Sequence, residues 1–135
     1  MPLVTWDMTY SVKVHECDVQ HQQLFALIND LYDAMVARQG DQVTKQIVED
    51  LMELSKLHFR TEESLLEKTA YPELEAHRAH HREFLKRVEQ FQRDQANGKA
   101  LEPRFVANRF MMWWTRHARQ IDRKYSEHLN ACGVF

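Results

Sequence analysis

Four segments of this chain repeat apolar residues at the three- and four-residue steps of an α-helix, and each apolar stripe also contains histidine. Because the connecting segments are short, successive helices should run antiparallel. The sequence therefore predicts an all-α fold, an up-down-up-down four-helix bundle. Its helices are expected over about residues 18–38, 41–69, 73–96 and 103–129.

The ends of these helices follow from cap and breaker residues. Asp18 is a plausible N-cap for the first helix, and Pro103 fits the first turn of the fourth. Residues 1–17 are weakly patterned and are expected to lie on the bundle as an extended arm. The whole chain of 135 residues, 1–135, fits one domain with a single core.

Charge and composition exclude several classes of protein. The net charge of −2 and the lack of a basic stripe argue against a nucleic-acid partner. No apolar run approaches the roughly 20 residues that span a bilayer, and the N-terminus does not resemble a signal peptide. We expect a cytoplasmic protein. Cys17 and Cys132 are expected to be reduced, although a single disulfide between the ends remains an alternative.

The four predicted helices carry seven side chains of metal-ligand type. They are His21, His58, Glu62, His77, His81, His117 and Asp122. The pairs at 58/62 and 77/81 are four residues apart, so each pair projects from one helix face. The pair at 117/122 is five apart, which is about 140° around an ideal helix. Either the aspartate reaches sideways, or the helix distorts locally.

A lone histidine on an apolar face is usually an ordinary core residue, but seven buried polar groups are costly. Burying each of these groups costs on the order of several kcal/mol unless the group is paired or bound to metal. Seven ligands exceed the four of a structural zinc site and suit two bridged ions. Imidazole and carboxylate without thiolate fit iron, manganese, zinc or copper, so these residues leave the metal open.

Specific motifs then resemble those of a known family, the single-domain bacterial hemerythrins (bacteriohemerythrins). The resemblance runs from Trp6 to Tyr125. Its elements are DVQH at 18–21, HFxxEE at 58–63, Tyr71-Pro72, HxxxH at 77–81 and WxxxHxxxxD at 113–122.

The resemblance implies a non-haem di-iron centre, two Fe ions with a bridging oxo or hydroxo group, that binds O2 reversibly. By position, His77, His81 and His117 would hold the coordinatively full iron. His21 and His58 would hold the iron that keeps an open site. Glu62 and Asp122 would bridge the two ions.

The resemblance also implies an O2 pocket, lined by Leu24, Phe59 and Trp113. Ala118 departs from the family pattern, in which a large aliphatic residue is usual. This difference predicts a roomier, wetter pocket and faster autoxidation. Glu63 is expected on the flank of the bundle, because it lies about 100° from Glu62 around the helix.

The expected role is oxygen carriage, storage or buffering, not enzymatic turnover. A reductase or an O2-consuming enzyme would be the protein partner. Two alternatives remain open. The same centre could act as an O2, NO or redox sensor that signals to a partner, or as a di-iron oxidase or peroxidase.

Overall fold

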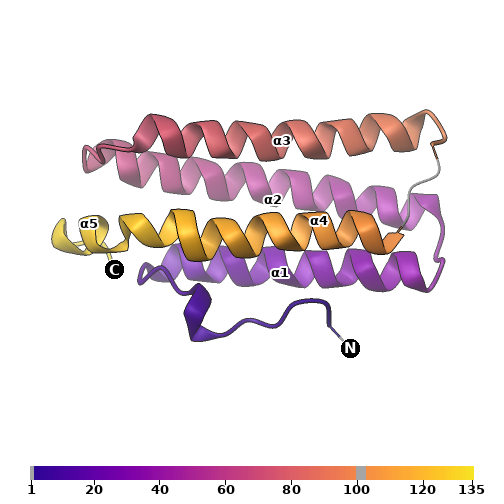
Figure 1. The fold of residues 1–135 in the computed structure, drawn as a ribbon, viewed down its shortest axis with the longest axis horizontal. Helices are drawn as coiled ribbons and strands as arrows, with labels where there is room; N and C mark the ends of the chain where they lie inside the picture. Colours follow the sequence, from indigo (N-terminus) through magenta and orange to yellow (C-terminus); the bar gives the residue numbers. More distant parts are fainter. Residues whose placement is uncertain (1, 100–102) are drawn as a thin grey trace.

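A computed structural model describes residues 2–99 and 103–135 (Figure 1). Four long helices lie side by side and alternate in direction: α1 (His15–Val36), α2 (Asp41–Lys68), α3 (Leu74–Ala96) and α4 (Pro103–Arg116). The described residues contain no strand, so the predicted all-α bundle is confirmed. None of the helices in the described residues is long and apolar enough to cross a membrane.

The first helix begins three residues earlier than predicted, and Asp18 is not its N-cap. Val14 precedes the helix in extended conformation, and no side chain caps the helix there. Asp18 instead accepts hydrogen bonds from the Ser11 hydroxyl at 2.6 Å and the Val12 amide at 2.8 Å. Asp18 therefore fixes the N-terminal arm to α1. The turn into α2 uses Gly40, whose φ of 102° suits glycine.

The arm, residues 2–14, runs along the side of the bundle and contains one 3₁₀ turn, η1 (Met8–Tyr10) (Figure 1). The Asn29 side chain pairs with both the amide and the carbonyl of Val4, at 2.9 and 2.8 Å. The Arg119 guanidinium lies 3.9 Å from the centre of the Tyr10 ring. The Tyr10 ring packs edge-on against Phe25. The arm is thus bound to two different parts of the bundle.

The sequence predicted a continuous fourth helix over about 103–129, and this prediction is wrong. After α4 the chain forms a π-helical turn, η2 (His117–Ile121), then a 3₁₀ turn, η3 (Asp122–Tyr125). A short helix, α5 (Ser126–Ala131), follows. The interruption coincides with two of the predicted ligands.

The core consists of two apolar clusters with a polar layer between them. The larger cluster includes Phe25, Ile28, Leu31, Leu51, Phe84, Val88, Phe110 and Trp114. The smaller contains Val12, Val14, Cys17, Leu66, Tyr71, Tyr125 and Leu129. Along α1, for example, Cys17 belongs to the smaller cluster, His21 to the polar layer and Leu24 to the larger cluster. Cys17 is buried and Cys132 is exposed, and both are free thiols, so the alternative disulfide is not formed.

Candidate metal centre

The polar layer brings all seven predicted ligands together. Their ligand atoms form two overlapping groups, and within each group the atoms lie within 4.8 Å of one another. One group comprises Glu62, His77, His81, His117 and Asp122, and the other His21, His58, Glu62 and Asp122. All seven residues are buried. Glu62 and Asp122 belong to both groups, so they lie between them.

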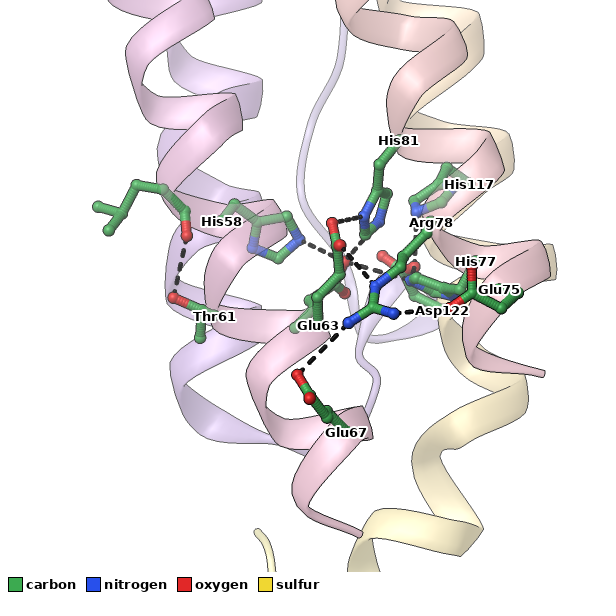
Figure 2. Close-up of polar contacts among 12 residues, drawn as sticks. His58, Thr61, Glu63, Glu67, Glu75, His77, Arg78, His81, His117 and Asp122 are labelled. Atoms are coloured by element: carbon green, nitrogen blue, oxygen red, sulfur yellow. Dashed lines mark hydrogen bonds and ion pairs between the residues drawn. The ribbon is translucent and has the colours of Figure 1, made fainter. Parts of the chain in front are cut away.

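The five histidines share one orientation. Each ring directs its Nε2 atom toward a carboxylate oxygen. Glu62 Oε1 lies 3.3 Å from His58 Nε2, 3.4 Å from His77 Nε2 and 3.1 Å from His81 Nε2. Figure 2 shows four of these rings, from His58, His77, His81 and His117, converging from α2, α3 and η2.

Asp122 uses its two oxygens on opposite sides. Its Oδ2 lies 2.9 Å from His21 Nε2, while its Oδ1 lies 2.7 Å from His117 Nε2 and 3.1 Å from His77 Nε2. One carboxylate oxygen therefore faces each histidine group. This is the arrangement that a carboxylate shared between two cations requires.

The π-helical turn is what brings Asp122 over His117. The Asp122 amide donates to the carbonyls of Ala118 and His117, and the second bond is the i to i−5 pairing of a π-helix. In a regular α-helix the two side chains would diverge by about 140°. Of the two alternatives that the sequence left open, local distortion of the helix is therefore the correct one. Asp122 does not reach sideways from a regular helix.

Electrostatics favour ionised carboxylates in this buried layer. Burial would raise the pKa of Glu62, but His58 and its neighbours outweigh burial and lower the pKa well below its ordinary value. Burial lowers the pKa of His117 to about 4, so this imidazole is neutral and its nitrogen lone pair is free. His77 differs: burial lowers its pKa, but Asp122 and Glu62 prevail and raise it to about 10. The carboxylates thus require a nearby cation.

The donor set fits bound metal because its inward atoms are otherwise orphaned. The Nε2 atoms of His21, His58 and His117 and both oxygens of Asp122 are buried, yet none makes a well-aligned hydrogen bond. Buried polar atoms of this kind are rare in native proteins. Metal ligation requires neutral imidazoles and ionised carboxylates, so a bound metal would displace the proton that His77 holds in the metal-free chain.

Three residues that the sequence interpretation did not assign to the site contact the ligands. Gln20 Oε1 lies 2.6 Å from His58 Nδ1, and Glu63 Oε2 lies 2.9 Å from His81 Nδ1. Tyr125 donates to Glu62 Oε2. Glu63 is indeed on the flank, with 28 % of its side chain exposed, but it also reaches a ligand. Its place in HFxxEE beside Glu62 was the available signal.

Two of the four predicted pocket residues stack on ligand rings. Leu24, Phe59 and Ala118 are buried, and the Phe59 ring stacks on His81 at 3.9 Å. Trp113 is only partly buried and stacks on His117 at 4.4 Å. Its neighbour Trp114, which the sequence interpretation did not select, is fully buried with its ring 5.6 Å from that of His58.

A family model, "Hemerythrin HHE cation binding domain", matches residues 12–129. This chain belongs to the hemerythrin family. A bacteriohemerythrin of Stenotrophomonas maltophilia is 27 % identical over 97 % of this chain and 84 % of its own length. A second bacteriohemerythrin, of Methylococcus capsulatus, is 28 % identical over 97 % of this chain and 100 % of its own length.

Solved structures agree with the family assignment. The crystal structure of a wild-type hemerythrin matches with a TM-score of 0.88 and 24 % identity, covering 94 % of this chain and 98 % of that one. A point mutant described as hemerythrin matches with a TM-score of 0.89 and 25 % identity, covering 96 % and 98 %. The hemerythrin fold therefore extends over nearly the whole chain.

Proposed function

We propose that this hemerythrin-family chain binds O2 reversibly at a di-iron centre and serves oxygen carriage, storage or buffering. The observation that carries the proposal is the pair of overlapping ligand groups that share Glu62 and Asp122. A site for one ion would not need two groups. Two groups with two shared carboxylates suit two bridged ions.

The two groups differ in a way that supports ligand binding at one of them. His77, His81 and His117 would hold one iron together with the shared carboxylates. His21 and His58 would hold the second iron, which then has one protein ligand fewer and room for an external ligand. The two irons would each supply one electron when O2 binds and take it back when O2 leaves.

The protein contributes a largely apolar surrounding to this site. The fully buried Leu24 and Trp114 and the nearly buried Phe59 lie in the larger apolar cluster beside the ligand layer. Excluding water there would protect bound O2 from protons. Aromatic rings also stack on His81 and His117 of the other ligand group. We therefore propose binding without turnover, with a reductase as the partner that restores ferrous iron.

The test combines a metal count with a visible spectrum. The protein is loaded with iron anaerobically, reduced and exposed to O2. We expect two irons per chain and a charge-transfer band that disappears when O2 is removed. His58→Ala should lose the band, whereas His80→Ala should keep it, because His80 belongs to neither ligand group.

Other results would point elsewhere. A chain without stoichiometric iron would contradict the proposal. Immediate oxidation without a reversible band would favour a redox sensor, and sustained consumption of peroxide or NO would favour an enzyme.

A further inference from the structure

The outward faces of the ligand histidines are not alike. Because all five rings direct Nε2 inward, their Nδ1 atoms point away from the centre. In the described part of the chain, two of these Nδ1 atoms meet a side chain: His58 meets Gln20, and His81 meets Glu63. His58 and His81 belong to different ligand groups. One group therefore has a neutral outer partner and the other an anionic one.

The orientation of the Gln20 amide follows from a chain of hydrogen bonds. The Thr61 hydroxyl donates to the Leu57 carbonyl at 3.1 Å, a bond drawn in Figure 2. Thr61 Oγ1 can then accept from the Gln20 amide nitrogen, which lies 3.2 Å away. The remaining amide atom, Oε1, faces His58 Nδ1 and can only accept. His58 is thus fixed with its proton on Nδ1 and its lone pair on Nε2.

Glu63 is held in place from its other side. Arg78 Nε donates to Glu63 Oε1 at 3.2 Å, while Glu63 Oε2 accepts from His81 Nδ1 (Figure 2). Arg78 also pairs with Glu75 at 2.6 Å and Glu67 at 3.4 Å. These two carboxylates are exposed and, as Figure 2 shows, lie beyond Arg78 from His81. Glu63 is therefore the carboxylate of this network that touches a ligand.

We propose that Gln20 and Glu63 are positioning residues that make the two metal sites electrostatically unequal. A carboxylate on the distal nitrogen makes an imidazole a more basic ligand than an amide does. The group of His77, His81 and His117 should consequently bind a cation more tightly than it would if the outer partners of both groups had the same charge. This inference rests on the proposed two-metal site.

The test uses Co²⁺, which requires neither O2 nor a change of oxidation state. Metal-free protein is titrated with Co²⁺, and the two binding steps are followed by visible absorption. Paramagnetic proton NMR reports the exchangeable ring N–H of each ligated histidine. In Glu63→Gln we expect the tighter step to weaken by about 10–100-fold, and the His81 N–H to exchange faster with solvent. The weaker step and the His58 signal should not change.

A reciprocal variant provides an independent arm. Gln20→Glu should tighten the weaker step, and the double exchange Gln20→Glu/Glu63→Gln should bring the affinities of the two steps closer together. Glu67→Gln is the matched control. It removes another carboxylate that pairs with Arg78 without touching a ligand, and should titrate as the wild type does.

Equal weakening of both steps in Glu63→Gln, or the same change in Glu67→Gln, would overturn the inference, because surface charge alone would then explain the result. The proposed function is tested separately. Unequal Co²⁺ sites in a protein that never binds O2 reversibly would support the inference and defeat the proposed function. Reversible O2 binding, together with Co²⁺ affinities that do not change in Glu63→Gln, would support the proposed function and overturn the inference.

Discussion

His117 Nε2 lies 2.7 Å from Asp122 Oδ1 although the two residues are five apart, because the intervening chain is a π-helical turn. This contact places one carboxylate against both histidine groups. The turn therefore sets the geometry of the whole polar layer.

Moving the carboxylate by one residue should destroy the site. In the double variant Ile121→Asp/Asp122→Ile, the composition is unchanged but the carboxylate turns away from His117. We expect metal affinity to fall by more than about 100-fold, exceeding the usual cost of losing an outer partner. Equilibrium dialysis followed by metal analysis measures the loss. The exposed Gln120→Ala, in the same turn, serves as control; wild-type affinity in the double variant would show that the turn is not required.

Tyr125 should stabilise the fold through Glu62. Its hydroxyl donates to Glu62 Oε2, and both residues are fully buried. Tyr125→Phe leaves that oxygen without a donor, so urea unfolding of the metal-free chain should show a loss of about 1–3 kcal/mol. Tyr71→Phe, which removes a partly buried hydroxyl bonded to Glu73, should cost less. Equal losses would contradict a special role for Tyr125.

Ala118 tests whether the pocket has spare volume. It is fully buried in the larger apolar cluster, directly after His117. If space exists beside it, Ala118→Ile should fill it, exclude water and slow autoxidation of the oxygenated protein, measured from the decay of the visible band. If the site is already filled, overpacking should cost about 1–3 kcal/mol in urea unfolding. An unchanged autoxidation rate would reject the roomier pocket.

Arg119 should hold the arm against the π-helical turn. It donates to Thr9 Oγ1 at 2.7 and 3.1 Å and lies over the Tyr10 ring. Arg119→Ala should accelerate amide hydrogen exchange in the arm while leaving the centre of α2 unchanged. Arg123→Ala is the matched control, because it removes the same charge from an exposed position. Similar exchange in both variants would show that the contacts with α1 and α5 hold the arm without Arg119.

The metal-free chain should lose stability as pH falls below about 6.5. Unfolded histidine binds a proton near that pH, whereas folded His117, whose pKa burial lowers to about 4, does not. Glu62 and Asp122, whose pKa values are lowered despite burial, add the same effect below about pH 4. His77, with a raised pKa of about 10, stabilises fully below about pH 6.5 and loses its contribution as pH rises from there toward 10, so it adds no slope in the acid range. Unfolding midpoints in urea from about pH 7 to 4 measure this slope.

A variant tests the assignment of this slope to His117. His117→Gln removes the buried imidazole, so its midpoint should change less between pH 6.5 and 4 than that of the wild type. A midpoint that stays constant between pH 6.5 and 4 would contradict the burial of neutral His117.

Helical periodicity was enough to predict the bundle and to select six of the seven side chains that meet in the polar layer, whereas Asp122 lies off the regular helical spacing. Periodicity could not predict the π-helical turn, because a distortion of this kind depends on tertiary contacts around Asp122. It also missed the true start of α1, since Asp18 is engaged by Ser11 and Val12. Gln20 and Glu63 escaped notice because their contact with a neighbouring helix depends on how the helices are rotated about their axes.

The placement of the polar layer between two apolar clusters bears on how this protein unfolds. Each cluster is a potential cooperative unit, and the layer that joins them is held by charges that attract a cation. Metal that binds only the native layer stabilises both units together, so their unfolding becomes coupled. When the layer is empty, the smaller cluster, which includes the end of the chain near Leu129, becomes the part that can open first while the larger one stays folded. Loading the site would then decide whether the bundle unfolds in one transition or in two.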